Sequence, residues 1–160
     1  MGRLGWILAA ASLGLLAVLA AGCGTTGTVS RVGGAGLRGG PVILSAEKIP
    51  DLGTVLVDEG VTLYVFAPDR ATEVTCKGPC ASAWPPLTIA PGQRPSASGA
   101  VRSELLGTDP GPEGSRVVTY AGWPLYSFVS DTEPGEANGQ NVDLNGGYWY
   151  VISPAGKIIR

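Results

Sequence analysis

The apolar residues that follow position 40 occur in short runs bounded by glycine, proline, aspartate and asparagine. The runs are rich in β-branched and aromatic residues, which favour strands, and none has a convincing 3.6-residue period. They are PVILSAEK (41–48), TVLVDEG (54–60), VTLYVF (61–66), SRVVTYAG (115–122), PLYSF (124–128) and YWYVISPAG (148–156). The pattern predicts an all-β domain over residues 41–160, folded as a small sandwich or barrel-like structure.

One part of this pattern occurs twice. GVTLYVFAPD, residues 60–69, is similar to GWPLYSFVSD, residues 122–131, and both contain Tyr-x-Phe-x-x-Asp. In each copy a strand, a tight turn and a second strand precede the aspartate, as in a β-hairpin. We therefore expect two superposable β-hairpin repeats, over about 53–87 and 115–154, related by a pseudo-twofold axis.

The repeated motif supplies candidate residues for a core or for a site. With the tryptophan that follows each copy, they are Tyr64, Phe66, Asp69, Trp84, Tyr126, Phe128, Asp131 and Trp149. Alternate residues of a strand share one face, so we expect the tyrosine and phenylalanine of each copy to pack in a common core. Each aspartate follows a strand end, where its carboxylate can accept backbone amide bonds and fix a turn. Ligand or ion binding by the two aspartates is the alternative.

The first 22 residues have the pattern of a secretory signal peptide. One early positive charge is followed by an apolar run that is too short to span a membrane. The run ends in LAAGC, and small residues directly before Cys23 suit a lipoprotein signal peptidase. The sequence predicts a lipoprotein signal peptide over residues 1–22, a lipid-modified Cys23 and a flexible tether over residues 23–40. The protein would then be lipid-anchored at the extracytoplasmic face of the cell membrane. An ordinary signal peptide that ends near a cysteine is the alternative.

The chain has three cysteines, an odd number for an exported protein. If Cys23 carries lipid, Cys76 and Cys80 remain as one pair in an oxidising compartment. The segment between Cys76 and Cys80 contains glycine and proline, so it can form a loop that brings the two cysteines within disulfide range. A disulfide there would position Trp84. A redox-active pair is an alternative, although we expect no helix after this loop. A metal site that uses both thiolates is another.

The composition excludes several classes of function. The 160-residue chain has no histidine, which removes Ser-His-Asp and Cys-His catalysis and most zinc sites. Its 11 basic and 13 acidic residues are nearly balanced, and no basic run could follow a nucleic-acid backbone. The sequence therefore predicts a protein that is not an enzyme and that binds no cofactor, metal or nucleic acid.

Oxygen-bearing side chains crowd the glycine-rich segment 131–147. NVDLNG imitates the opening of a calcium-binding loop. However, Asn141 replaces the leading aspartate, and Ile152 stands where the closing glutamate belongs. We expect a solvated acidic loop, with calcium binding as the alternative.

Several segments together resemble the "secreted repeat of unknown function" family of predicted bacterial lipoproteins. They are TLYVFAPD, CKGPCASAWPPL, VTYAGWPLYSFVSD, EPGEANGQ and WYVISPAGK. Members of this family carry a Y-x-(F/W/Y)-x-x-D motif, usually in tandem copies, and the resemblance extends from about Gly53 to Lys157. NVDLNGG is longer than the corresponding loop of the family. The resemblance implies a location and a repeat architecture, and it supplies no activity.

Two classes of function follow from these observations. We expect a non-catalytic envelope module that binds an unknown envelope protein or a small ligand through its hairpins and loops. The alternative is a redox or metal-handling lipoprotein that uses Cys76 and Cys80. A hydrolase that acts through a carboxylate pair, Asp69 and Asp131, is a third hypothesis.

Overall fold

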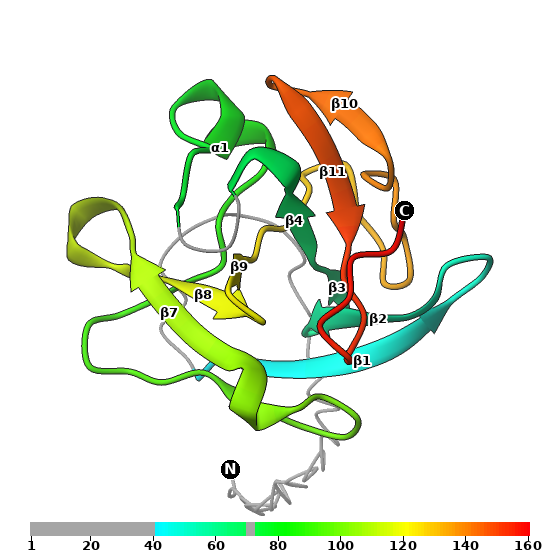
Figure 1. Cartoon of the computed structure of the whole chain (residues 1–160), viewed down its shortest axis with the longest axis horizontal. Coiled ribbons are helices and arrows are strands. Elements are labelled where there is room, and N and C mark those ends of the chain that lie inside the picture. Colours follow the sequence, from blue (N-terminus) through cyan, green and yellow to red (C-terminus); the bar gives the residue numbers. More distant parts are fainter. Residues whose placement is uncertain (1–40, 70–72) are drawn as a thin grey trace, which may run out of the picture. The chain divides into compact units, whose positions relative to one another are not determined.

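The structure, a computed structural model, describes residues 41–69 and 73–160 (Figure 1). The predictions for the signal peptide, Cys23 and the tether lie outside these residues. The strands are β1 (Ile43–Ile49), β2 (Gly53–Asp58), β3 (Val61–Thr62), β4 (Tyr64–Phe66), β5 (Thr88–Ile89), β6 (Ser96–Ala97), β7 (Leu106–Pro110), β8 (Arg116–Tyr120), β9 (Trp123–Pro124), β10 (Val142–Leu144) and β11 (Gly147–Val151). Most regular structure in the described residues is strand, so the predicted all-β fold is confirmed.

The strands form three small sheets. Their orders are β3-β2-β1-β6, β10-β11-β4 and β5-β8-β7, and β9 also pairs with β8. The β2–β3 and β8–β9 connections are two-residue turns, Glu59-Gly60 and Ala121-Gly122. All four turn residues have positive φ, which is the conformation that lets a tight turn match the twist of paired strands. The tight turn predicted between the two strands of each copy is therefore present.

A pseudo-twofold axis passes between the two copies of the motif. Tyr64 and Tyr126 pair with each other in an isolated antiparallel bridge. The amide of Tyr64 donates to the carbonyl of Tyr126 at 2.8 Å, and the amide of Tyr126 donates to the carbonyl of Tyr64 at 3.0 Å. The two copies of the motif therefore pair with each other through the same residue, the motif tyrosine.

Equivalent backbone hydrogen bonds recur on the two sides of this axis. The amide of Leu56 donates to Ile152 at 2.9 Å, and the amide of Val118 donates to Leu87 at 2.8 Å. Within each hairpin, Leu63 donates to Leu56 and Leu125 donates to Val118, both at 3.0 Å. The predicted architecture of two pseudo-symmetric β-hairpin repeats is confirmed.

The core consists of two clusters of buried side chains, and β4 contributes to both. Tyr64 and Phe66 point into one cluster, whereas Leu63 and Val65 point into the other. Strand alternation therefore places the tyrosine and phenylalanine of the first copy on one buried face, as expected.

The second copy of the motif differs from its predicted strand. Tyr126 forms only isolated bridges, one of them with Pro86, whereas β4 pairs with β11 over three residues. Pro85 and Pro86 have no amide hydrogen, so this neighbour cannot continue a ladder of backbone hydrogen bonds. PLYSF, residues 124–128, is therefore buried in an extended path without becoming a regular strand.

The structure also corrects the expectation that no helix follows the cysteine loop. A one-turn helix, α1, spans Pro79–Ala83 and includes Cys80. Its start suits the sequence, because Gly78 has a positive φ of 57° and proline is favoured in the first helical turn. Three single 3₁₀ turns occupy Ala67–Asp69, Ser103–Leu105 and Pro112–Gly114. No helix among the described residues is long and apolar enough to cross a membrane.

Candidate functional site

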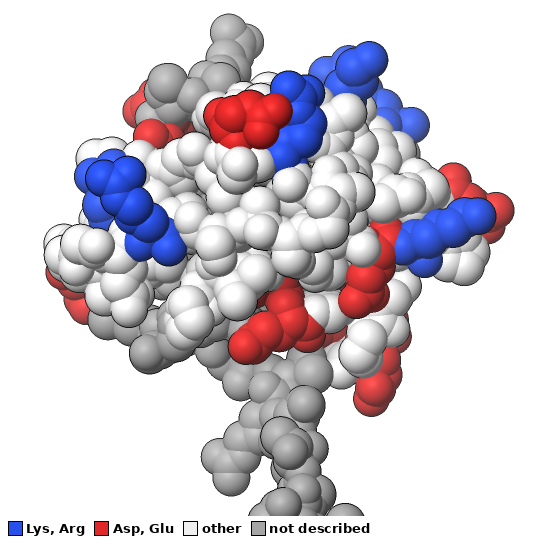
Figure 2. All heavy atoms as spheres, turned by 90° about the horizontal axis from the view of Figure 1, so that it is seen from below, with Lys and Arg blue, Asp and Glu red and all other residues white. Residues whose placement is uncertain are grey.

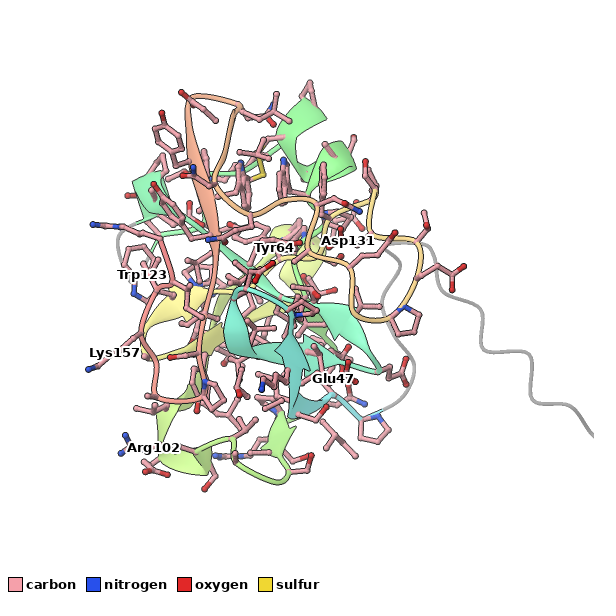
Figure 3. The ribbon with its side chains drawn as sticks, turned by 90° about the vertical axis from the view of Figure 1, so that its right-hand side faces the viewer. Glu47, Tyr64, Arg102, Trp123, Asp131 and Lys157 are labelled. Atoms are coloured by element: carbon pink, nitrogen blue, oxygen red, sulfur yellow. A yellow bond between two sulfur atoms is a disulfide. The ribbon has the colours of Figure 1, made fainter. Side chains whose placement is uncertain are left out.

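The motif tyrosines and aspartates bond across the two repeats. The hydroxyl of Tyr64 donates to Oδ2 of Asp131 at 2.6 Å, and the hydroxyl of Tyr126 donates to Oδ2 of Asp69 at 2.6 Å. Figure 3 shows Tyr64 and Asp131 side by side in the interior. All four residues are buried, with Asp131 the most exposed at 6%. In each of these two equivalent contacts, one repeat therefore supplies the tyrosine and the other repeat supplies the aspartate.

The second oxygen of each aspartate holds the loop that follows it. Oδ1 of Asp69 accepts hydrogen bonds from the amide of Thr75 at 2.9 Å and from its hydroxyl. Oδ1 of Asp131 accepts from the amide of Asn138 at 2.9 Å. The expected turn-fixing role of the aspartates is present, but it accounts for only one oxygen of each carboxylate.

Burial controls the ionisation of the two tyrosines and of Asp131. It raises the pKa of both Tyr64 and Tyr126 strongly, and the neighbouring carboxylate raises each pKa further. Burial also raises the pKa of Asp131, against the hydrogen bonds from Tyr64 and Asn138 that favour the charged form. The two phenols are therefore neutral hydrogen-bond donors near neutral pH, and neither can serve as a general base.

Four aromatic rings stack between the two tyrosines. Phe66 lies on Trp149 with ring centroids 4.3 Å apart, and Phe128 lies on Trp84 at 4.0 Å. At the centre the indoles of Trp84 and Trp149 face each other at 3.9 Å with an interplanar angle of 1°. The phenylalanine of each repeat thus packs on the tryptophan of the other repeat.

The tyrosines contact this stack edge-on. Tyr64 meets Trp84 at 5.3 Å, and Tyr126 meets Trp149 at 5.1 Å. Gly139 closes over the first pair, and a Cβ there would lie 2.5 Å from the Trp84 ring and 2.9 Å from Tyr64. The phenols and indoles therefore form one continuous buried aromatic cluster.

The two indoles differ in their polar contacts. Nε1 of Trp149 donates to the carbonyl of Leu144 at 3.1 Å. Nε1 of Trp84 is fully buried and has no hydrogen-bond partner among residues 41–69 and 73–160. This is a departure from the pseudo-symmetry at an atom that usually finds an acceptor when buried.

Cys76 and Cys80 form a disulfide, with Cα atoms 5.3 Å apart. Both residues are buried, and the amide of Trp84 donates to the carbonyl of Cys80 at 2.8 Å. The disulfide expected from the sequence is present, and α1, which contains Cys80, ends directly before the central indole of Trp84. Neither sulfur is a free thiolate in this state, and the described part of the chain has no group of three or more metal-ligating side chains.

In the loop after Asp131, the acidic side chain of Glu136 bonds to the protein itself. Oε2 of Glu136 accepts from the amides of Thr132 and Glu133 at 2.6 and 3.1 Å. These amides lower the pKa of Glu136, because they stabilise its charged form. The residues that imitate a calcium loop instead form strand β10 and the turn before β11.

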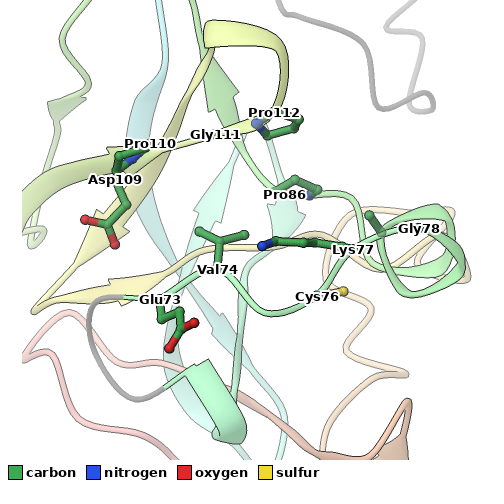
Figure 4. Close-up of a pocket in the computed structure, with 11 residues that line it drawn as sticks. Glu73, Val74, Cys76, Lys77, Gly78, Pro86, Asp109, Pro110, Gly111 and Pro112 are labelled. Carbon is green, nitrogen blue, oxygen red and sulfur yellow. The ribbon is translucent and has the colours of Figure 1, made fainter.

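A pocket of about 580 Å³ lies between the cysteine loop and the tip of the β7–β8 hairpin. Its walls include Val74 and Pro86, and Figure 4 shows Lys77 extending into it from one side, with Glu73 and Asp109 on the other. Burial raises the pKa of Asp109. Sequence reasoning missed this pocket, because its two walls are about thirty positions apart in the chain.

The cross-repeat bonds were also missed, although the sequence contained a signal for them. Tyrosine lies near the centre of each copy, and the aspartate follows it at the same distance. When two such copies meet at their tyrosines, each tyrosine faces the other copy, so the opposite aspartate is the nearer partner. The hydrolase hypothesis for Asp69 and Asp131 finds no support here, because both carboxylates are buried and bonded to tyrosine.

The sequence was compared with protein families, curated proteins and solved structures. The profile of a family described as secreted repeat of unknown function matches residues 48–88 and 107–153, more than half of the chain. Each matched segment contains one copy of the motif and the tryptophan that follows it. No curated protein and no solved structure matches significantly.

Proposed function

Because the chain belongs to the family described as secreted repeat of unknown function, we propose that it is a lipid-anchored envelope protein whose β domain binds a ligand or partner without catalysing a reaction. The reciprocal Tyr–Asp bonds are the observation that supports this most. They engage both motif hydroxyls and both motif carboxylates inside the core. The motif then has a structural role, and the ligand or partner binds at the surface of the domain.

The pocket beside the cysteine loop is the concave surface that suits a small ligand. It combines two carboxylates, Glu73 and Asp109, and one ammonium, Lys77, with apolar walls, so its charged side chains have an excess of negative charge. Small-molecule sites commonly pair an apolar lining with a few polar groups that orient the ligand. This chemistry favours a small amphipathic molecule with a cationic amine and an apolar body.

A titration of the full protein in detergent tests this binding site. The probe is tryptamine, whose amine and indole match the two parts of the pocket, and binding is followed by isothermal calorimetry. We expect Asp109→Asn to weaken binding by roughly tenfold, which corresponds to the loss of one charged contact. Glu104→Gln is the matched control, because Glu104 is an acidic residue outside the pocket. Equal binding by wild type and Asp109→Asn would contradict the pocket assignment.

The lipid anchor is tested separately. Mass spectrometry of the N-terminal peptide of the mature protein should show a diacylglyceryl group on Cys23. Cys23→Ala should release the protein from the membrane fraction. Membrane retention of this variant would contradict the anchor and leave the binding proposal untouched.

The partner is proposed to be other than nucleic acid. In the view of Figure 2, lysine and arginine side chains are set apart from one another, with acidic side chains between some of them. Binding to a phosphate backbone needs several clustered cations. The low and nearly balanced charge of the chain supports a small ligand or a protein instead.

A further inference from the structure

The domain concentrates its oxidisable side chains in one buried cluster. The chain's single methionine is Met1, and the two cysteines after position 40 are joined in a disulfide. Indoles and phenols are therefore the readily oxidised groups of residues 41–160. Four of them, Tyr64, Trp84, Tyr126 and Trp149, belong to the continuous aromatic cluster in the core.

The stacked indoles are arranged for electron exchange. Trp84 and Trp149 lie parallel at 3.9 Å, so a positive charge on one ring can be shared with the other. Phe128 extends the stack from Trp84 at 4.0 Å and is only half-buried, so the stack begins close to the surface. An oxidant outside the domain therefore needs to reach only a short distance to draw an electron from the indole pair.

The indoles have no base to take their N–H proton. The N–H of Trp149 points at a backbone carbonyl, and that of Trp84 has no partner in the described structure. A one-electron-oxidised indole becomes a neutral radical only by losing this proton. Oxidation of the pair thus leaves a radical cation, which remains a strong oxidant toward its neighbours.

The phenols, in contrast, have a proton acceptor in place. Each tyrosine hydroxyl lies 2.6 Å from a carboxylate oxygen, and each phenol ring contacts one of the indoles. A phenol that loses an electron becomes a very strong acid, so it transfers its proton to such an acceptor without moving. The oxidation therefore ends at the tyrosines, as a neutral tyrosyl radical.

We propose that this core is a relay for one-electron oxidation, in which the Trp84–Trp149 pair passes a positive hole to Tyr64 and Tyr126, whose protons move to Asp131 and Asp69. This activity is independent of surface binding. The oxidant is a one-electron acceptor at the domain surface, such as an oxidised metal complex or an organic radical.

The step balances in atoms and electrons. The external oxidant gains one electron from Trp149, so its oxidation state falls by one. Trp149 is left as an indole radical cation. Trp149 then takes one electron from Tyr126, while the O–H bond of Tyr126 breaks and its proton bonds to Oδ2 of Asp69. The products are a neutral tyrosyl radical, a protonated Asp69 and a restored Trp149. An external one-electron donor reverses the step.

Flash photolysis of the full protein in detergent tests the relay. Photogenerated tris(bipyridine)ruthenium(III) serves as the oxidant, and transient absorption and electron paramagnetic resonance identify the radicals. We expect the wild type to show an indole radical that decays into a neutral tyrosyl radical. In the Tyr64→Phe/Tyr126→Phe variant the tyrosyl signal should be lost and the indole radical should live roughly tenfold longer, equivalent to about 1.4 kcal/mol of barrier.

A further variant keeps the test valid if the double tyrosine variant folds poorly. Asp69→Asn and Asp131→Asn, combined in one protein, retain both tyrosines and remove both basic acceptors, so tyrosyl formation should slow by roughly tenfold. Tyr148→Phe is the control, because Tyr148 is 45% exposed and lies outside the cluster. A tyrosyl signal that survives the double variant and disappears in Tyr148→Phe would overturn the relay and show that oxidation is confined to the surface. Unchanged tyrosyl kinetics in the combined aspartate variant would also overturn it.

Discussion

The loops that join the motif aspartate to the tryptophan differ between the repeats. In the first repeat this loop runs from Asp69 to Trp84 and contains a disulfide and the short helix α1. In the second it runs from Asp131 to Trp149, is three residues longer and contains no cysteine. Both loops nevertheless present an amide to the aspartate and deliver a fully buried indole to the same stack.

The second loop uses hydrogen bonds where the first uses a covalent bond. Glu136 caps the turn after Asp131, and the side chain of Gln140 bridges two segments: its Oε1 accepts from the amide of Val151 at 2.8 Å and its Nε2 donates to the carbonyl of Ile159 at 2.9 Å. Part of the longer chain forms the β10–β11 hairpin, closed by a two-residue turn at Asn145 and Gly146, both with positive φ. Both loops thus begin at an aspartate and end at a tryptophan that occupy equivalent places. The contacts that hold each loop in its conformation differ between the repeats.

Removing either central indole should have the largest effect on stability. Trp84→Ala and Trp149→Ala are each expected to lower the free energy of unfolding by about 3–5 kcal/mol, as truncation of a buried aromatic does. Similar losses would confirm that the two loops deliver equivalent residues. The measurement is urea denaturation of the protein without reductant.

Phenylalanine substitutions sharpen this comparison. Trp149→Phe removes a hydrogen bond to Leu144, whereas the Trp84 N–H has no partner to lose in the described part of the chain. We expect Trp149→Phe to be less stable than Trp84→Phe by about 1 kcal/mol. The reverse order would contradict the assigned difference between the two indoles.

Alkaline pH should act on both repeats through their tyrosines. Tyr64 and Tyr126 have a folded-state pKa well above the ordinary value of 10.0, so the folded protein holds protons that the unfolded chain releases. Their contribution to stability is complete below pH 10 and is lost as the pH rises above it. Urea midpoints should therefore stay level up to about pH 10 and fall as the pH rises above it.

Single substitutions separate the contributions of the two tyrosines to this loss of stability at alkaline pH. Tyr64→Phe and Tyr126→Phe should each flatten the alkaline slope by a similar amount, because each removes one buried phenol. The matched control is Tyr148→Phe, since Tyr148 is exposed and its substitution should leave the slope unchanged. A slope that responds to only one of the two buried tyrosines would break the equivalence of the repeats.

The disulfide gives a test that affects only the first loop. Replacing both Cys76 and Cys80 by serine should lower the free energy of unfolding by about 2 kcal/mol or less, because the closed loop is short. Amide hydrogen exchange should rise around α1 and stay unchanged in the loop after Asp131. Alkylation of the native protein without reductant should label neither cysteine, and ready labelling would contradict the disulfide.

The sequence was sufficient for the hairpins and insufficient for their contacts. Strand alternation and the glycine-containing turns predicted β2–β3 and β8–β9, because these pairings are local. Tyr64 and Asp131 are 67 positions apart, and no local preference indicates a bond across that separation. The repeat implied a twofold arrangement, but not which atoms would lie at the axis.

The short helix α1 was missed for a different reason. Its five residues are too few for an apolar period, and isolated helices of this length are unstable. It forms because Gly78 and Pro79 set the turn and the disulfide closes it. Likewise, the missing strand in PLYSF depends on Pro85 and Pro86, which lie about forty positions earlier in the chain.

The smallest expected effect is that of Asp131→Asn. The amide keeps one acceptor for the loop amide of Asn138 and can still contact the hydroxyl of Tyr64, so the loss near neutral pH should be about 1 kcal/mol.

The pH dependence of this loss identifies its cause. Burial raises the pKa of Asp131, so the folded state binds its proton more tightly than the unfolded state does. The stability linked to this proton is complete below the unfolded value of 3.8 and is lost as the pH rises through the folded pKa. The Asp131→Asn variant has no such proton, and the wild type should therefore exceed the variant most at acid pH, with the gap narrowing toward neutrality. Urea denaturation of both proteins across this range measures the gap, and a gap that widens toward neutral pH would show that the charged carboxylate, rather than the protonated one, is the form that the core favours.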